Sequence, residues 1–253
     1  MKTKTLLVLF GLLLGALSAS AADARKKIVM LISEPEYDTA KTLPEFAAKF
    51  LAKDFRVVVV NGMAAPNDNA FDKIQEVADA DVLLISARRR TPPKEQFEVI
   101  RRYLAAGKPV VGIRTASHAF VLRNGKPAEG LADWPDWDAK VIGGSYTNHY
   151  GKGPIATMTA ATPAHPILRG VKLPFTSDAT LYQSNPLRTG AQALLTGMIA
   201  EKPAESVAWT FTRPDGGRTF YTSLGAPSDF QNASFTQLLQ NGIAWAAGTL
   251  PAK

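Results

Sequence analysis

Four short apolar runs alternate with segments of helical spacing in the first half of the chain, and this alternation restricts the fold more than any other feature. The runs lie at 27–32, 56–60, 82–86 and 109–113. Each is almost entirely apolar, which is typical of strands that are covered on both faces of a parallel sheet. Strands that alternate with helices are joined by right-handed crossovers. The sequence therefore predicts an α/β fold.

The rest of the sequence predicts further helices and strands but no linker or repeat, so we expect one domain. Four helices are predicted: one begins at a capping box over 42–45, and a second covers 71–78. A third begins near Pro92 or Pro93 and stops at Gly107, and a closing helix carries apolar residues over 235–246 and ends at Gly248. The predicted strands lie at 141–144 and 155–160, and a hairpin is predicted from 207–211 and 219–223.

The N-terminal stretch has the pattern of an export signal. Two lysines precede an apolar run at 6–17, and small residues follow at 19–21. This apolar run is too short for a confident membrane span. We expect 1–21 to be a secretory signal peptide and 22–253 to be the mature domain, without a membrane span, in the periplasm or secreted.

Charge and cysteine content limit the partners and the sources of stability. Cleavage would remove two lysines and no acidic residue, so the formal net charge would fall from +7 to +5. The sequence has no basic stripe interleaved with aromatic residues, which argues against nucleic acid as a partner. It also has no cysteine, so apolar burial rather than a disulfide must hold an exported chain together. Nothing in the composition indicates an oligomeric state.

Polar segments follow three of the predicted strands. They lie at 33–37, 86–90 and 114–118. The carboxyl ends of parallel strands meet at one edge of a sheet, and ligands bind at that edge in open α/β folds. The three segments are therefore expected to form a site.

Acidic and basic side chains in these segments have two readings. In the first, Glu34 and Glu36 act as acid or base. Arg88 and Arg89 bind a carboxylate or a hydroxyl-rich ligand bidentately, and Tyr37 contacts the same ligand. In the other reading, the glutamates and arginines form an ion-pair network that shapes the loops. The sequence leaves both open.

The chain has three histidines, and one of them is the preferred candidate for proton transfer. His149 lies in a polar loop, and its imidazole titrates near neutral pH; Asn148 and Tyr150 beside it are candidate substrate contacts. His165 is expected to order a turn. His118 either faces the site or packs under it. No close ligand spacing such as HExxH occurs, so no metal is assigned.

Several common catalytic patterns are missing. Ser117 and His118 are adjacent, and neighbours on a helix point in different directions, so a nucleophile–base pair is not expected; both stay candidate substrate contacts. GxSxG, GxGxxG and Walker motifs are absent, so no cofactor is identified. The aromatic residues between 134 and 150 can stack on sugar rings or anchor the core.

Longer motifs resemble those of a known family. They are Lys-Pro-Val-Val-Gly-Ile-Arg-Thr-Ala-Ser-His-Ala-Phe at 108–120, Gly-Gly-Ser-Tyr-Thr-Asn-His-Tyr at 143–150, and shorter segments at 165–167, 207–210, 217–225 and 241–246. In these motifs the chain resembles the trehalose-utilisation (ThuA-like) family, whose fold is similar to class I glutamine amidotransferases. The resemblance implies a flavodoxin-like, doubly wound, mainly parallel sheet with helices on both faces, and a link to disaccharide or keto-sugar catabolism.

The chain also departs from these patterns. Alignment of Gly112 and Ile113 places Arg114 where the amidotransferases carry a cysteine nucleophile. A guanidinium cannot attack a carbonyl, which excludes glutamine hydrolysis. Ala179 and Thr180 replace an Asp-Glu pair that many relatives carry, and Ala226 replaces a histidine.

The leading hypothesis is an exported enzyme that acts on a disaccharide or keto-sugar by hydrolysis or isomerisation. Arg114 would anchor an oxyanion or carbonyl, and His149 or Glu36 would move the proton. The alternative is a non-catalytic sugar- or anion-binding module.

Overall fold

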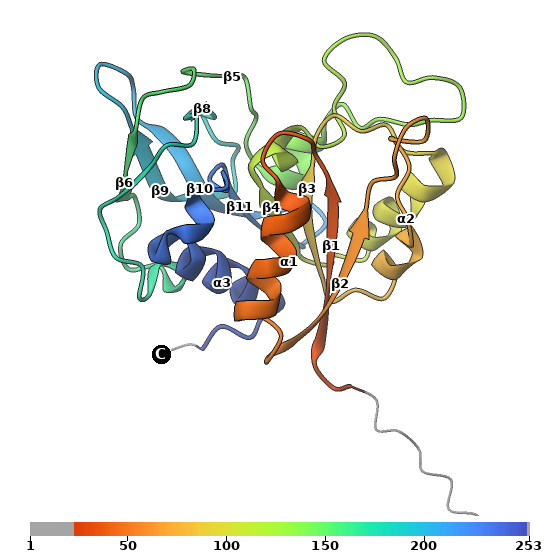
Figure 1. The fold of residues 1–253 in the computed structure, drawn as a ribbon, viewed down its shortest axis with the longest axis horizontal. Helices are drawn as coiled ribbons and strands as arrows, with labels where there is room; N and C mark the ends of the chain where they lie inside the picture. The colour runs from red at the N-terminus through yellow and green to blue at the C-terminus, as the bar shows by residue number, and fades with distance from the viewer. Residues whose placement is uncertain (1–22, 252–253) are drawn as a thin grey trace, which may run out of the picture.

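A nine-stranded sheet forms the centre of the computed structural model, which describes residues 23–251 (Figure 1). The strand order is β2-β1-β3-β4-β11-β10-β9-β6-β7, and β5 and β8 pair separately as a small ribbon. The strands are β1 Lys26–Ser33, β2 Phe55–Asn61, β3 Val82–Ala87, β4 Val110–Ile113, β5 Asn148–His149, β6 Ala156–Ala160, β7 Phe175–Ser177, β8 Tyr182–Gln183, β9 Ala191–Met198, β10 Glu205–Thr212 and β11 Arg218–Thr222.

The sheet is parallel in one half and antiparallel in the other. Strands β2, β1, β3, β4 and β11 pair in parallel, whereas β10, β9, β6 and β7 continue the sheet with antiparallel pairings. The short turn between β10 and β11 permits only antiparallel pairing of those strands. The predicted α/β class is confirmed, but the sheet is mixed, and the mainly parallel arrangement holds only for its core.

Helices cover both faces of the sheet, as predicted. Helices α1 (Thr39–Phe50) and α3 (Ala233–Ala247) pack on one face, and α2 (Lys94–Ala105) packs on the other (Figure 1). Strand β1 is buried on both sides, since Met30 belongs to the first core cluster and Leu31 to the second. Short helical turns occur at η1 Ile74–Val77, η2 Arg114–His118, η3 Asp138–Ile142, η4 Pro166–Leu168 and η5 Asp229–Gln231.

Two predicted elements differ from the structure. The helix expected at 71–78 is reduced to the single turn η1, and the strand expected at 141–144 is replaced by the end of the π-helical turn η3. At the second position, backbone carbonyls bind side chains instead of a neighbouring strand. Val141 O accepts the hydroxyl of Thr219 at 2.7 Å, and Ile142 O accepts the indole N–H of Trp209 at 2.8 Å.

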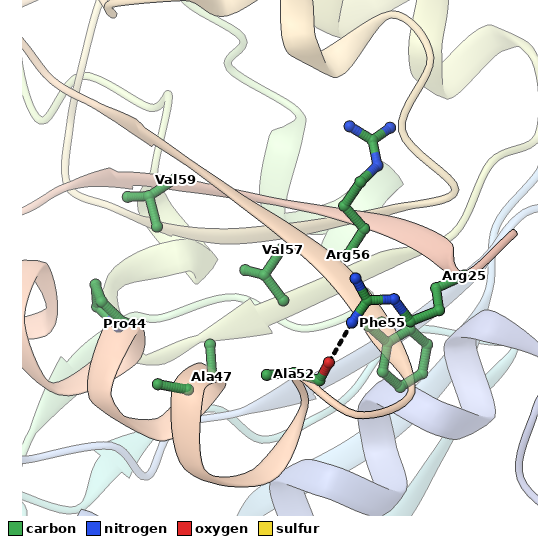
Figure 2. A pocket seen from close by; sticks show the side chains of 9 residues that line it. Arg25, Pro44, Ala47, Ala52, Phe55, Arg56, Val57 and Val59 are labelled. Carbon is green, nitrogen blue, oxygen red and sulfur yellow. Dashed lines mark hydrogen bonds between the residues drawn. The ribbon is translucent and has the colours of Figure 1, made fainter. Parts of the chain in front are cut away.

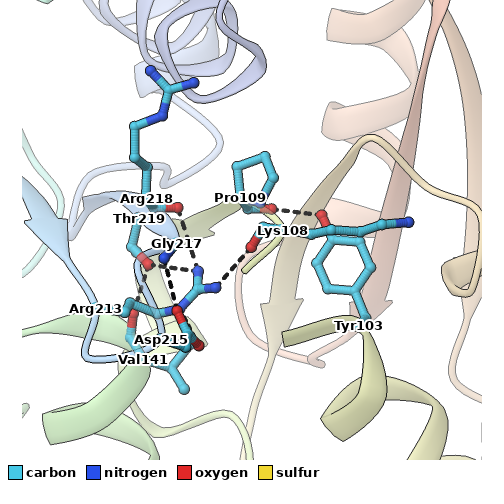
Figure 3. A network of polar contacts seen from close by, with 9 residues as sticks. All are labelled: Tyr103, Lys108, Pro109, Val141, Arg213, Asp215, Gly217, Arg218 and Thr219. Carbon is cyan, nitrogen blue, oxygen red and sulfur yellow. Dashed lines mark hydrogen bonds and ion pairs between the residues drawn. The ribbon is translucent and has the colours of Figure 1, made fainter. Parts of the chain in front are cut away.

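A buried arginine fixes the start of β4 against the β10–β11 hairpin (Figure 3). Arg213 donates to Lys108 O at 2.8 Å and pairs with Asp215 at 3.1 Å, and its side chain is fully buried. The carboxylate of Asp215 also accepts the N–H of Gly217 at 2.8 Å, which closes the hairpin turn. This network holds β4 in register, and the opposite end of β4 carries Arg114.

The predicted signal peptide lies outside the described residues. Between residues 23 and 251, none of the helices combines the length and the apolar character that a membrane span requires. The described residues form two apolar core clusters, one on each face of the sheet.

Candidate functional site

Five strands, β1, β3, β4, β11 and β7, run in the same direction and end at one edge of the sheet; β7 is brought into this direction by the antiparallel half of the sheet. The segments that follow β1, β4, β11 and β7 contribute to one pocket there. The pocket has a volume of about 400 Å³ and is lined by Glu36, Tyr37, Arg114, Lys152, Asp178, Ala179, Thr180, Ala226, Pro227 and Ser228. The predicted convergence of polar strand ends is therefore present in the fold.

Arg114 occupies the sharp turn between β4 and η2. Its φ is +50°, in the left-handed region that L-residues rarely adopt, and strained turns of this kind present the nucleophile in α/β hydrolases. The hydroxyl of Tyr221 donates to Arg114 O at 2.6 Å. Gly112 makes room for this contact, because a Cβ there would lie 2.9 Å from the Tyr221 ring. The turn thus has the geometry of an elbow, with an arginine at its tip.

The guanidinium of Arg114 is held almost entirely by the protein. It is 1% exposed, lies 4.4 Å from each of the Tyr37 and Tyr182 rings, and donates to Thr180 Oγ1 at 2.6 Å. It also donates to Thr180 O, to Ser223 O and, at 3.5 Å, to the hydroxyl of Tyr37. Within residues 23–251, its Nε has no acceptor. Arg114 therefore acts on the pocket mainly through its charge and by fixing Tyr37.

Aromatic rings continue from Arg114 toward the ribbon of β5 and β8. Tyr146 lies 4.5 Å from Tyr182 and 4.6 Å from His118 between ring centroids. The ring of His149 is stacked with that of Tyr146, with 6.5 Å between the ring centroids. The row connects the pocket to the two histidines predicted as site residues.

His118 is buried under this row, and it is uncharged near neutral pH. Burial, and then the positive charges of Arg89, Arg88, Arg123 and Arg114, lower the pKa of His118 to about 3. Its Nδ1 lies 3.1 Å from the hydroxyl of Ser117, so the expectation that these neighbours cannot pair is wrong for this 3₁₀ turn. Ser117 is 2% exposed and lies outside the pocket lining, so the pair is not placed to attack a ligand there.

The buried histidine predicts a pH dependence of stability. In the unfolded chain His118 takes up a proton near pH 6.5, whereas in the folded chain it does so only near pH 3. Stability is therefore lost as the pH falls between these values, by roughly 2 kcal/mol at pH 5. Urea denaturation of wild type and His118→Gln at pH 7 and pH 5 should show that the variant loses less stability than wild type. Equal losses in the two proteins would contradict this account of His118.

The loop after β1 is closed by Glu34. Its carboxylate accepts the N–H groups of Glu36 at 2.7 Å and Tyr37 at 2.8 Å, and both groups of Thr39 that can donate. This explains why α1 begins at Thr39, earlier than the predicted capping box. Glu34 therefore orients Glu36 and Tyr37 rather than lining the pocket itself.

The arginines after β3 differ from one another. Arg88 pairs with Glu36 at 3.0 Å, and Arg90 pairs with Asp68 at 3.1 Å. Arg89 instead donates to Val121 O at 3.0 Å, and burial, followed by the charges of neighbouring arginines, lowers its pKa. Arg88 and Arg90 therefore form ion pairs, as the second interpretation of this segment expects. Among residues 23–251, Arg89 pairs with no carboxylate.

Three other predicted residues lie around the ribbon rather than in the pocket lining. His149 is exposed on β5, and its Nδ1 accepts the N–H of Gly151 at 3.0 Å, which leaves the proton of the neutral ring on Nε2. Asn148 accepts the N–H of His149 at 2.9 Å. The hydroxyl of Tyr150 donates to Glu205 at 3.2 Å.

Sequence reasoning missed part of the pocket. Lys152, Asp178 and Ser228 lie in segments without a clear motif, and Asp178 follows a strand of only three residues. The hydroxyl of Ser228 donates to Asp178. A signal was nevertheless present, because the departures noted at Ala179, Thr180 and Ala226 all fall in the lining.

A second pocket lies on the outer edge of the sheet and offers different chemistry (Figure 2). It has a volume of about 360 Å³ and lies between α1 and the edge strand β2, with Ala47, Val57 and Val59 in its wall. Arg25, which donates to Ala52 O, and Arg56 are its only titratable residues. Without an acid or base partner, this pocket is a poorer candidate for catalysis.

The residues of the first pocket do not form an evident metal site. Among residues 23–251, no three His, Cys, Asp or Glu side chains are grouped as metal ligands. The lining provides carboxylates, hydroxyls, an ammonium group and an aromatic ring, which are groups that bind polar organic molecules.

The fold and the pocket define an α/β protein with a polar site at the carboxyl edge of its sheet. The family model of ThuA, described as trehalose utilisation, matches residues 29–246, so the chain belongs to the ThuA family. The predicted resemblance is confirmed. No curated protein sequence matches the chain significantly.

Solved structures support the fold. A ThuA-like protein from Bacteroides uniformis is similar with a TM-score of 0.66 and 15% identity, covering 92% of this chain and 95% of that one. A ThuA-like protein from Parabacteroides merdae has a TM-score of 0.62 and 17% identity, with coverage of 90% and 92%. A β-galactosidase from Rahnella sp. R3 has a TM-score of 0.57 and 13% identity, with coverage of 90% of this chain and 32% of that one. At these identities the similarity concerns the fold alone.

Proposed function

We propose that this ThuA protein is exported and acts on a disaccharide or keto-sugar, by hydrolysis or isomerisation, in the pocket above Arg114. The observation that carries the proposal is that two carboxylates, Glu36 and Asp178, line the same pocket together with an aromatic ring and hydroxyl groups. The family description, trehalose utilisation, supports a sugar as the substrate. Export is testable by sequencing the N-terminus of the mature protein, which is expected to begin at Ala22.

The lining suits a sugar in several ways. The ring of Tyr37 is fixed by Arg114 and can stack on the apolar face of a pyranose. The hydroxyl of Thr180 accepts from Arg114, so its own proton is available to a sugar oxygen. The buried positive charge of Arg114 favours a carbonyl oxygen that gains negative charge, although most of its N–H groups are occupied.

Glu36 is the preferred group for proton transfer. Its carboxylate lines the pocket and pairs with Arg88 at 3.0 Å, so it is held where it can accept a proton from a ligand. In hydrolysis, Glu36 would take a proton from the attacking water, and Asp178 would pass to the leaving oxygen a proton that it has taken up from solvent. In isomerisation, Glu36 would take the proton from the carbon next to the carbonyl and return it to the carbonyl carbon, while the proton of the neighbouring hydroxyl moves to the former carbonyl oxygen. His149, across Tyr146, is the other candidate.

Glu36→Gln is expected to lower kcat/KM by about a hundredfold or more, because it removes the proton acceptor while keeping the shape of the side chain. The measurement is turnover of a panel of disaccharides and keto-disaccharides by the purified protein. Glu76→Gln is the matched control, since Glu76 is 39% exposed and pairs with Lys27, as Glu36 is 40% exposed and pairs with Arg88. Wild-type turnover by Glu36→Gln would exclude this role, and His149→Gln would then test the other assignment.

A non-catalytic binding module is the second candidate. The observation that favours it is the saturation of Arg114 by protein acceptors, which leaves little of the guanidinium to polarise a substrate. In that case the sugars of the panel would raise the melting temperature without being converted.

A further inference from the structure

Among the described residues, only one of three arginines near His118 forms an ion pair with a carboxylate. The charges of Arg88, Arg89 and Arg123 all act on this imidazole. Arg88 pairs with Glu36, but within residues 23–251 neither Arg89 nor Arg123 forms an ion pair. Like charges that lie close together repel, and the repulsion is strongest where the groups are partly withdrawn from water. Such a cluster is most stable when an anion from outside joins it.

Arg89 is held in an unfavourable state that an anion would relieve. Its φ is +51°, in the left-handed region, and its backbone N–H donates to His118 O at 3.1 Å. Among the described residues, its side chain donates only to Val121 O, and its buried Nε has no acceptor. A guanidinium presents five N–H donors in a planar fork that fits the oxygens of a carboxylate or phosphate. Most of that fork is unused here.

This cluster is connected to the pocket through Glu36, and Tyr146 in the aromatic row near the pocket lies close to it. Glu36 lines the pocket and pairs with Arg88, the neighbour of Arg89 in sequence. The ring of Tyr146 contacts His118, and the charges of Arg123 and Arg89 act on its hydroxyl. A ligand that occupies the pocket could therefore extend a charged group toward Arg89.

We propose that Arg89 and Arg123, with Arg88 beside them, form an anion subsite, and that the ligand of the pocket is a sugar bearing a carboxylate or a phosphate. The inference rests on the proposed function for the sugar part and on the arginines for the charged part. A charge-assisted, bidentate bond to Arg89 adds both affinity and orientation. Arg123, which is exposed, contributes long-range attraction that salt screens.

The test compares three sugars that differ only at C6: glucose, glucuronate and glucose 6-phosphate. Isothermal titration calorimetry of the full mature protein at low salt should give at least one anionic sugar a Kd about tenfold or more below that of glucose. Preference for glucuronate identifies a carboxylate subsite, and preference for glucose 6-phosphate identifies a phosphate subsite.

Variants assign the preference to the arginines. Arg89→Gln should remove most of the advantage that the anionic sugar has over glucose. Arg123→Gln, at an exposed position where folding is not at stake, should weaken the anionic sugar severalfold. Arg102→Gln removes the same charge from the exposed face of α2 and should change neither. An equal loss in Arg102→Gln would mean that net charge, not a subsite, causes the preference, and would overturn the inference.

The outcomes separate this inference from the proposed function. If neutral keto-disaccharides are bound or converted but the anionic sugars have no advantage, the subsite is excluded and the sugar site stands. If inorganic phosphate binds in an Arg89-dependent way while no sugar binds, the subsite stands and the sugar function fails. If none of these probes binds, both are excluded.

Discussion

Arg114→Ala is expected to lower the free energy of unfolding by about 4 kcal/mol, which is the largest single effect of a substitution in the site. The change removes a donor from the buried carbonyl of Ser223 and from the half-buried carbonyl of Thr180, and the loss at a buried carbonyl costs about 1–3 kcal/mol. It also removes the cation between the rings of Tyr37 and Tyr182 and leaves a cavity under the pocket. Urea denaturation measures the change.

Arg114→Gly distinguishes the stability that the arginine side chain provides from the strain that its backbone conformation costs. Both variants lose the guanidinium, but glycine adopts the φ of +50° without strain, so it should be more stable than the alanine variant by about 1 kcal/mol. Glycine and alanine variants of equal stability would show that the turn relaxes when the arginine is removed. A loss below about 1 kcal/mol in both would contradict the view that Arg114 holds the site together.

Asp229→Ala is expected to cost about 3 kcal/mol and to loosen the wall of the pocket. Its buried carboxylate accepts the hydroxyl of Ser177 at 2.6 Å and the N–H groups of Gly225 at 2.8 Å and Ala226 at 3.0 Å. These donors lose their acceptor in the variant, and at least two of them stay buried. Burial raises the pKa of Asp229, yet these three donors favour its ionised form.

The control for Asp229→Ala is Asp178→Ala, because Asp178 is exposed and accepts one hydroxyl, from Ser228. The control should lose less than about 1 kcal/mol in urea denaturation. Hydrogen exchange of the Gly225 and Ala226 amides should increase in Asp229→Ala and stay unchanged in Asp178→Ala. Unchanged exchange in both variants would show that Asp229 does not order this wall.

The parallel core of the fold could be predicted because each strand carries its own signal. The apolar runs of β1, β2, β3 and β4 are long and uniform, and the helix that ends at Gly248 is amphipathic. The antiparallel half was harder, because β7 has only three residues, and such a short strand forms through its partner rather than through local preference. The hairpin of β10 and β11 was predicted, but the antiparallel pairing beyond it was not.

The site residues that follow clearly predicted strands could be foreseen, and the others could not. Glu36, Tyr37 and Arg114 follow strongly predicted strands, and the structure places all three in one pocket. Asp178 and Ser228 come from the segments that were not predicted, so the second carboxylate could not be foreseen. The pairing of Ser117 with His118 depends on the geometry of a 3₁₀ turn, which the sequence pattern does not specify.

The departures from the family pattern have a structural meaning. Arg114, Ala179, Thr180 and Ala226 are far apart in the sequence but line one pocket. Thr180 accepts a hydrogen bond from Arg114 at 2.6 Å, so these two departures form a direct contact. These positions lie together around a buried cation, and we infer that the ligand and chemistry of the pocket depend on that cation.

A crystal structure of the wild-type protein with a bound keto-disaccharide tests the central claim most directly. The account predicts density for a sugar ring against Tyr37, between Glu36 and Ser228, above the guanidinium of Arg114. An empty pocket at a concentration that saturates binding in solution, or a sugar bound at the β2 edge instead, would contradict it.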